Sequence, residues 1–282
     1  MKSFKINILS RYYPLKHKTA ALAFGCYIAA FAIFLSGCST LGIYNPATEK
    51  REFIFVSTPE EASMGRTIHQ NILEKYKLSQ DKEKQERLDK IGSRIVQISD
   101  RQDLAYKFYL LEDKELNAFT VPGGSVYFNT GLFDKLENED QIAGVLAHEI
   151  GHSAARHTIK KFQAALGYNL VASLVLTHLG LEENSARLAS MGADVIMGMV
   201  FNAYSRQDEY EADRLAVKYL YFSGYRPEAM AESFEILKKE SKEQKGFLYF
   251  RTHPYIEDRI VAINQEVVKV RTKYDGPEAQ NK

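Results

Sequence analysis

The pattern of apolar and polar positions predicts a mainly helical chain with a small β component. Apolar and polar residues alternate along the aromatic-rich segment Leu104–Leu111, which predicts a strand. The turn residues Pro122-Gly123-Gly124 precede a second predicted strand, Ser125–Asn129. Elsewhere apolar residues recur at helical spacing, and helices are predicted near residues 58–76, 82–99, 140–159, 162–179, 185–201, 206–222, 227–243 and 256–273. The pattern therefore predicts an α+β fold that is predominantly helical.

Two of the predicted helices, residues 162–179 and 185–201, are apolar enough to resemble membrane spans. Both are shorter than the roughly 20 residues that a span requires. Polar residues also interrupt them, namely Asn169, His178, Arg187 and Asp194. We therefore favour buried core helices, or an apolar surface that faces substrate or membrane.

The N-terminus has the pattern of an export signal. A basic stretch is followed by the apolar run Ala20–Leu35 and then by Ser36-Gly37-Cys38. Leu35-Ser36-Gly37-Cys38 resembles the bacterial lipobox, in which the cysteine is lipidated and becomes the first residue of the mature protein. This resemblance implies attachment to a membrane through lipidated Cys38, and Ser39 after it favours the outer membrane, facing the periplasm. The alternative is an uncleaved signal anchor in which Cys38 is an ordinary residue.

The sequence divides into four predicted segments. Residues 1–37 are the signal peptide, 38–56 a tether without clear periodicity, 57–275 the folded domain, and 276–282 a polar tail. Cys26 would be removed with the signal peptide and Cys38 consumed by lipidation. The mature chain would then hold no free thiol, which suits an oxidising compartment.

Composition and charge indicate a folded protein that does not bind nucleic acid. The chain is 45% hydrophobic and 26% charged, as folded proteins are. Residues 1–37 hold five of the 37 basic residues and none of the 36 acidic ones, so the remainder is mildly acidic. We find no basic patch with interleaved aromatic residues, which a nucleic-acid surface would require.

His148-Glu149-Ile150-Gly151-His152 lies within the helix predicted at residues 140–159. Residues four apart share one face of a helix, so both imidazoles can bind one metal ion. Glu149 lies one position round the helix, where it can take a proton from a metal-activated water. Chance spacing on a solvated helix face is the alternative, and a poor one in a chain with seven histidines. We predict one Zn²⁺ per chain, although ligand type only favours zinc over other divalent ions.

The third metal ligand is less evident. The metzincin pattern places a glycine seven and a histidine ten positions after the first histidine, where this chain has Ala155 and Thr158. His157 falls one residue short, so we interpret it as structural or as a group behind the ligands. Glu209 and Asp213 share one helix face, so one can bind metal while the other orients a histidine. Glu211 points away from that pair, and a solvated acidic face is the alternative.

The order of several motifs resembles that of the gluzincin family that includes HtpX, the CAAX prenyl proteases and the lipoproteins LoiP and BepA. The motifs span about residues 57–270 and are Asn117-Ala118-Phe119, Pro122-Gly123-Gly124, His148-Glu149-Ile150-Gly151-His152, Glu209-Tyr210-Glu211-Ala212-Asp213, Thr252-His253-Pro254 and Arg259. The resemblance implies a zincin-like metallopeptidase domain with a small sheet beside the active-site helix. It also implies that Glu209 is the third ligand and Asp213 its partner, with His253 and Arg259 lining the catalytic cleft.

Two further groups have candidate roles in catalysis. His253 can donate a hydrogen bond to the oxyanion formed in peptide hydrolysis. It can instead bind zinc as a fourth ligand and inhibit the enzyme, since catalytic zinc needs an open position. Asn117, Ala118 and Phe119 belong to a predicted exposed strand edge, residues 117–121, that can bind an extended polypeptide through its backbone. Asn117 can equally be a turn residue.

These residues predict a zinc endopeptidase that cleaves unfolded or misassembled cell-envelope proteins. The alternative is an envelope chaperone or assembly factor whose proteolysis is occasional and regulated, with clients held by the apolar helices at 162–201. The sequence leaves the client proteins, the cleavage preference and the oligomeric state open.

Overall fold

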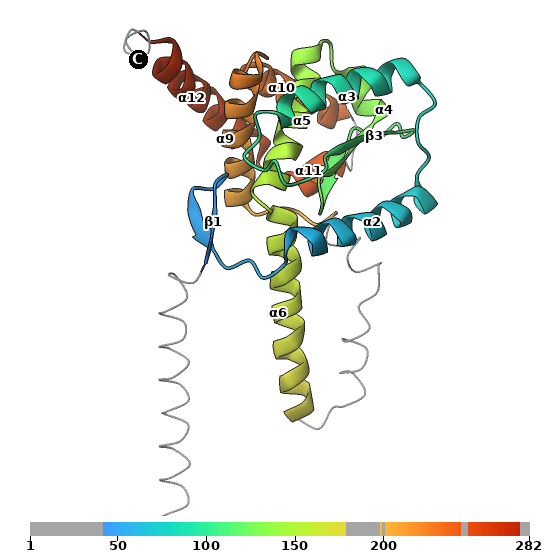
Figure 1. Ribbon diagram of the computed structural model, residues 1–282. Coiled ribbons are helices and arrows are strands. Elements are labelled where there is room, and N and C mark those ends of the chain that lie inside the picture. Colours follow the sequence, from blue (N-terminus) through green and yellow to red (C-terminus); the bar gives the residue numbers. More distant parts are fainter. Residues whose placement is uncertain (1–41, 179–197, 199–200, 244–247, 277–282) are drawn as a thin grey trace, which may run out of the picture. The chain divides into compact units, whose positions relative to one another are not determined.

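The computed structural model describes residues 42–178, 198, 201–243 and 248–276 (Figure 1). The chain divides into two compact units. The smaller comprises the chain up to Tyr44 together with Lys50–Phe53, and the larger comprises Asn45–Glu49 and the chain from Ile54 onward. The predicted signal peptide, Cys38 and most of the predicted helix at 185–201 lie outside the described residues.

The smaller unit contains a short hairpin. Strand β1 (Ile43–Asn45) pairs with β2 (Lys50–Glu52) in a two-stranded sheet. Three apolar side chains of this unit are largely exposed, at 60% for Ile43, 55% for Tyr44 and 66% for Phe53. The sequence predicted a tether without regular structure at residues 38–56, because a three-residue strand leaves too short a period to detect.

The turn Asn45–Glu49 belongs to the larger unit and is held there by polar contacts. The side-chain oxygen of Asn45 accepts a hydrogen bond from the N–H of Ala47 (3.1 Å), and Arg214 donates to the carbonyl of Ala47 (2.8 Å). Ala47 is 1% exposed. This part of the predicted tether is therefore packed against the helical domain.

Two capped helices follow this turn. Helix α2 (Thr58–Lys75) begins with a capping box, in which Ser57 and Glu60 satisfy each other's backbone N–H groups. Helix α3 (Lys82–Val96) begins at Asp81, whose side chain accepts a hydrogen bond from a first-turn N–H. Both helices direct an apolar stripe toward the core, formed by Ile68, Ile72, Leu88, Ile91 and Ile95.

A three-stranded mixed sheet lies beside these helices. Its order is β3 (Lys107–Leu111), β5 (Ser125–Asn129), β4 (Ala118–Val121), with β3 parallel and β4 antiparallel to β5. Gly123 and Gly124 form the β4–β5 turn at φ values of 84° and 86°, a left-handed region that a side chain disfavours. The turn therefore forms where the sequence predicted it. The strand order places β4 at one edge of the sheet.

The opposite edge of the sheet, along β3, is closed by a side chain. The amide of Gln85 donates to the carbonyl of Phe108 (3.0 Å) and accepts from the N–H of Leu110 (2.9 Å). This amide takes the place of a neighbouring strand along part of β3, and an antiparallel bridge between Leu78 and Leu111 covers the end of the strand. Along β4, by contrast, no further strand pairs with the sheet within the described part of the chain.

Helix α5 (Glu139–Ala154) is the centre of the core and is buried continuously from Gln141 to its end. It packs against α9 (Arg206–Ser223) and α10 (Ala229–Glu243). A side-chain carbon on Gly151 would lie 2.9 Å from a backbone oxygen of α9, and one on Gly144 would lie 2.9 Å from a Cα atom of α10. These two glycines allow the three helix backbones to approach closely.

The remaining helices are α4 (Thr130–Lys135), α6 (His157–His178), α11 (Leu248–Thr252) and α12 (Ile256–Asp275). The sequence did not predict α4 or α11, because five or six residues show too little periodicity. Within the described ranges, no helix is long and apolar enough to cross a membrane. The fold is α+β and mainly helical, with the small sheet packed against α5, as predicted.

One predicted helix is broken. The sequence predicted a helix at residues 140–159, but α5 ends at Ala154 and a new helix starts at His157. Between them Arg156 has a φ of 58°, which is uncommon for a residue with a side chain. The Arg156 guanidinium donates to the carbonyl of Val56 and pairs with Glu61 at 2.9 Å, and these contacts hold the turn.

Candidate metal centre

Three parts of the helical core bring the predicted site residues together. Helix α5 carries His148, Glu149 and His152, helix α9 carries Glu209, and the link between α11 and α12 carries His253. The first four are 0% exposed and His253 is 1% exposed. Residues that are up to 105 positions apart in sequence therefore share one enclosed site.

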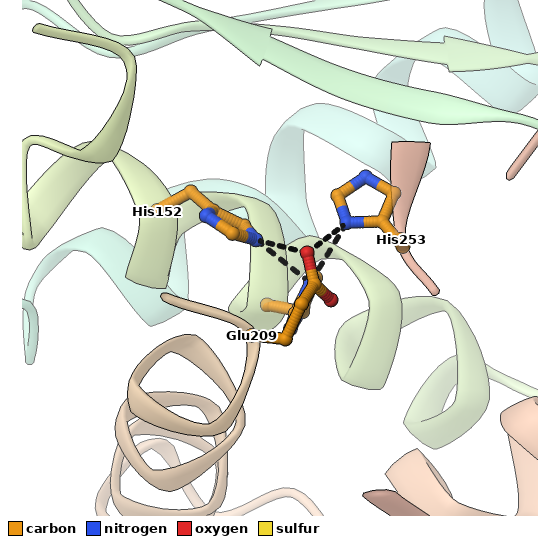
Figure 2. Close-up of side chains that lie close together, drawn as sticks. His152, Glu209 and His253 are labelled. Carbon is orange, nitrogen blue, oxygen red and sulfur yellow. Dashed lines mark hydrogen bonds and ion pairs between the residues drawn. The ribbon is translucent and has the colours of Figure 1, made fainter. Parts of the chain in front are cut away.

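The donor atoms of His148, His152, Glu209 and His253 all lie within 4.8 Å of one another. The Nε2 atoms of His148 and His152 are 3.0 Å apart, and Nδ1 of His253 lies 3.3 Å from Nε2 of His148. Glu209 Oε1 is 3.0 Å from Nδ1 of His253 and 3.5 Å from Nε2 of His152 (Figure 2). Figure 2 shows the side chains of His152, Glu209 and His253 directed at a common point from three different elements.

This donor set fits a zinc ion. Burial, assisted by the charge of Arg259, lowers the pKa of His148 well below its usual value, and burial also lowers the pKa of His152. Both imidazoles are therefore neutral and offer lone pairs. Burial opposes ionisation of Glu209, but Arg259, with His253, holds the pKa of Glu209 well below its usual value. Neutral imidazoles and one carboxylate are the ligands of catalytic zinc sites.

Glu149 lies beside the cluster without belonging to it. Both of its carboxylate oxygens are buried and have no hydrogen-bond partner within the described chain. Oε1 of Glu149 lies 3.5 Å from Nε2 of His253. Burial, together with the negative charge of Glu209, raises the pKa of Glu149 well above its usual value. A raised pKa means that this carboxyl group binds a proton more strongly than an exposed one does, which is what a general base requires.

A second layer of charged residues supports the donors. Asp213 Oδ1 lies 2.9 Å from Nδ1 of His148, an arrangement that directs Nε2 of His148 into the cluster. Arg259 is fully buried and donates to both oxygens of Asp213, from Nε at 2.8 Å and from Nη2 at 2.7 Å. The guanidinium also pairs with Glu209. The structure therefore brings Asp213 and Arg259 to the site.

Residues 82–267 match the sequence profile of Peptidase family M48. The chain belongs to this family. It is 29% identical over 191 residues to the Beta-barrel assembly-enhancing protease of Escherichia coli K12, covering 65% of this chain and 39% of that protein. It is 26% identical over 234 residues to Metalloprotease LoiP of the same strain, covering 81% of this chain and 90% of LoiP.

A third relative is eukaryotic. Mitochondrial metalloendopeptidase OMA1 of Schizosaccharomyces pombe is 26% identical over 235 residues, covering 82% of this chain and 68% of that protein. The match to Peptidase family M48 covers the residues that carry the donors His148, His152, Glu209 and His253. The chain spans well under half the length of the assembly-enhancing protease, at 39%.

The M48 site contains one residue that the sequence did not reveal. Tyr204 stacks on the ring of His152, with ring centroids 3.9 Å apart, and Lys161 lies 3.9 Å from the centre of the Tyr204 ring. The N–H of Tyr204 donates to the carbonyl of Thr252 (3.1 Å). Tyr204 therefore covers the cluster between α6 and the α11–α12 link. Its sequence neighbourhood carries no motif, so only the packing identifies it.

His157 and Glu211 lie behind His152. Nδ1 of His157 is 2.8 Å from Nδ1 of His152, and Nε2 of His157 is 3.1 Å from Oε2 of Glu211. His157 is not among the clustered donors. Glu211 faces His157 rather than Glu209, which agrees with its position on α9.

The predicted substrate strand is β4 at the edge of the sheet. The side chains of Asn117, Ala118 and Phe119 are at most 3% exposed, so a substrate at this edge would meet the backbone rather than these side chains. Thr120 Oγ1 lies 2.6 Å from Oγ of Ser153, which ties β4 to α5. The strand therefore lies against the helix that carries the metal-site histidines, with its backbone at the open edge of the sheet.

Proposed function

We propose that this chain is a zinc-dependent endopeptidase in which His148, His152 and Glu209 hold the metal and Glu149 is the general base. The observation that carries this proposal is the buried carboxylate of Glu149, which has no hydrogen-bond partner among the described residues and lies beside the converging donors. Ion pairs that only stabilise a fold do not leave a buried carboxylate without a partner, because that costs free energy. A general base, by contrast, is left without a protein partner because its partner is the attacking water.

The residues around the metal divide the catalytic work. Zinc, when bound, polarises the peptide carbonyl and lowers the pKa of the attacking water. Glu149 accepts a proton from that water and returns it to the leaving amine. Asp213 and Arg259 fix the orientation of the ligands, because two buried hydrogen bonds join the Arg259 guanidinium to the Asp213 carboxylate. A hydrogen-bond donor aimed at the oxyanion contributes on the order of 3 kcal/mol, and His253 is the candidate for this role.

His253 has two candidate roles, which exclude each other in this conformation. Its Nδ1 lies among the donors, 3.0 Å from Glu209, so it would occupy the position that a catalytic water needs. As a fourth ligand it would inhibit the enzyme until displaced by substrate. Replacing His253 with Ala separates the roles. Faster peptide cleavage supports inhibition, whereas a lower kcat at unchanged KM supports the oxyanion role.

The proposed substrate is an extended, unfolded polypeptide. The backbone edge formed by Asn117 and by β4, which includes Ala118 and Phe119, lies against α5 and can add a substrate strand through main-chain hydrogen bonds. Such binding depends little on the side chains of the substrate, so it suits misassembled cell-envelope proteins of many sequences. A folded control protein should resist cleavage under conditions that degrade its reduced or destabilised form.

The proposed location is the bacterial outer membrane, facing the periplasm, with the chain held by lipidated Cys38. The lipobox-like Leu35-Ser36-Gly37-Cys38 motif supports this location. Labelling of cells with a radioactive or clickable fatty acid should mark the wild-type protein. Retention of the label by a Cys38→Ala variant would contradict the proposal.

Replacing Glu149 with Gln tests the catalytic proposal. The variant should keep its zinc, because Glu149 is not a ligand, but should lose cleavage of an unfolded protein by at least about a hundredfold. Glu139→Gln is the matched control, since Glu139 is an exposed residue in the first turn of the same helix. Undiminished cleavage by the Glu149→Gln variant would reject the mechanism.

A chaperone or assembly role with only occasional proteolysis is the second candidate. It is favoured by the enclosure of the site, where every donor is at most 1% exposed, and by the assembly-enhancing protease among its relatives. The same Glu149→Gln variant discriminates between the two roles. If it restores the phenotype of a deletion strain as well as the wild-type chain does, cleavage is not the main function.

A further inference from the structure

We infer that His157 and Glu211 are positioning residues that fix the proton on the metal ligand His152 through a chain of two hydrogen bonds. The inference rests on the proposed metal site and not on peptide cleavage. All three residues of this hydrogen-bond chain are largely shielded from solvent. His152 and His157 are 0% exposed, and the side chain of Glu211 is 12% exposed.

The geometry places the three side chains in a line. Nδ1 of His152 is 2.8 Å from Nδ1 of His157, and the opposite nitrogen of His157, Nε2, is 3.1 Å from Oε2 of Glu211. The remaining nitrogen of His152, Nε2, lies in the donor cluster, 3.0 Å from Nε2 of His148. The nearest neighbour of each ring nitrogen is therefore defined, namely His148 for Nε2 of His152 and Glu211 for Nε2 of His157.

The carboxylate determines the position of each proton along this line. A carboxylate can only accept, so a neutral His157 that donates to Glu211 carries its proton on Nε2. Nδ1 of His157 is then an acceptor, and His152 must carry its proton on Nδ1 to donate to it. Nε2 of His152 is left with a lone pair that faces the donor cluster. The reversed arrangement, in which His157 donates to His152, would place a lone pair of His157 Nε2 against the carboxylate at 3.1 Å and an N–H of His152 in the donor cluster.

The backbone between the two histidines makes this contact possible. Residues five apart on an uninterrupted helix lie on different faces, because each residue advances the helix by about 100°. Arg156, at φ 58°, ends the run of helical conformation and starts α6 at His157 in a new direction. The ring of His157 thereby returns to contact His152, which sequence spacing alone does not allow.

A nearby carboxylate offers an alternative partner for His157. Asp208 Oδ1 lies 3.6 Å from Nε2 of His157, which is longer than a hydrogen bond. The other oxygen of Asp208 accepts from the N–H and hydroxyl of Ser205 in the capping box of α9. Asp208 therefore serves the helix cap, and Asp208→Asn is a control from the same helix turn.

The test uses two matched pairs of variants in the full-length chain with Glu149→Gln, which prevents self-cleavage. His157→Leu removes the acceptor, whereas His157→Gln keeps an amide oxygen for His152 and an amide N–H for Glu211. Glu211→Met removes the carboxylate, whereas Glu211→Gln keeps an acceptor oxygen. Zinc affinity is measured by competition with a chromogenic chelator, and cobalt-loaded protein reports ligand geometry by its visible absorption spectrum.

We expect His157→Leu and Glu211→Met to bind zinc 10- to 100-fold more weakly and to change the cobalt spectrum, as loss of a hydrogen-bonded partner behind a ligand does. His157→Gln, Glu211→Gln and Asp208→Asn should remain within about threefold of the reference. The comparison of the Glu211 pair does not depend on whether His157→Leu folds, which circular dichroism shows. Equal affinity within either folded pair, or a loss in Asp208→Asn as large as in Glu211→Met, would overturn the relay. Absence of zinc binding by the Glu149→Gln reference would instead reject the metal site itself.

Discussion

At the scale of single residues, the buried guanidinium of Arg259 balances two carboxylates behind the metal ligands. It donates to both oxygens of Asp213 and pairs with Glu209, and all three side chains are at most 3% exposed. Arg259→Ala would leave these carboxylates buried without a cation. Removal of one partner from such a buried group costs about 3–5 kcal/mol. We expect this loss in the unfolding free energy of metal-free protein, measured with urea.

Arg206 provides the control for this prediction. It pairs with Asp258 at 2.8 Å, but both side chains are more than half exposed. Water solvates and screens such a pair, so Arg206→Ala should cost no more than about 1 kcal/mol. Equal losses of unfolding free energy for the two substitutions would show that burial does not strengthen the ion pairs of Arg259.

The residues that the sequence identified share a short-range signal. His148, Glu149 and His152 lie in one motif, and helical spacing pairs Glu209 with Asp213. Tyr204 has no such signal, because its stacking on His152 depends on how α5 packs against the segment that precedes α9. Contacts of this kind are set by tertiary packing, which no pattern within a single segment encodes.

At the scale of helices, close approach of α5 and α9 places the proposed ligands His148 and His152 opposite the proposed ligand Glu209. Gly151 allows this approach, since an added Cβ would lie 2.9 Å from a backbone oxygen of α9. Gly151→Ala should therefore destabilise the fold by about 1–3 kcal/mol through overpacking. The thermal unfolding temperature measures this loss.

Gly167 in α6 is the matched control, because an added Cβ there would meet no atom within 4 Å. Alanine is a better helix former than glycine by roughly 1 kcal/mol, so Gly167→Ala should be neutral or stabilising. A stabilising effect of both substitutions would contradict the close approach of α5 and α9.

The stability of the fold at low pH depends on the contact between Thr58 in α2 and Asp103, which follows α3. Asp103 accepts hydrogen bonds from Arg101 and Thr58, and chiefly the Arg101 bond lowers the pKa of Asp103 to about 2, against a desolvation effect that raises it. A carboxylate whose pKa is lower in the folded state stabilises the fold above its unfolded pKa. That stability is lost as the pH falls from about 4 to about 2.

Asp103→Asn should therefore flatten the decline of unfolding free energy over this pH range and reduce stability at neutral pH. The side chain is 49% exposed, so solvent screening limits the effect to about 1 kcal/mol. Denaturant titrations at a series of pH values measure it. An unchanged pH profile in the variant would show that Asp103 makes no net contribution.

The sequence located the long helices well, because their apolar stripes repeat over several turns. It missed the break between α5 and α6, because residues 155 and 156 interrupt no apolar period and carry neither glycine nor proline. Arg156 is held at a positive φ by Glu61 and by the carbonyl of Val56, which lie about a hundred residues earlier. Long-range contacts of this kind override local preference.

At the scale of the whole larger unit, the candidate metal centre joins elements that are distant in sequence. Its donors come from α5, α9 and the link between α11 and α12. An ion that binds only this assembled arrangement stabilises it, by about 4 kcal/mol when free metal is a thousandfold above its dissociation constant. In a protein of this size each kcal/mol of added stability raises the thermal unfolding temperature by roughly 2–4 °C.

Zinc should accordingly raise the thermal unfolding temperature by on the order of 10 °C over protein held in a chelator. The Glu209→Gln variant should lose most of this shift, because an amide oxygen is a weaker zinc ligand than a carboxylate. Glu139→Gln, which alters an exposed residue of α5, should keep it. A shift of equal size in Glu209→Gln would place the ion elsewhere. Because this measurement reports on binding to the folded assembly, it tests the proposed ligands even if His253 keeps the site inactive.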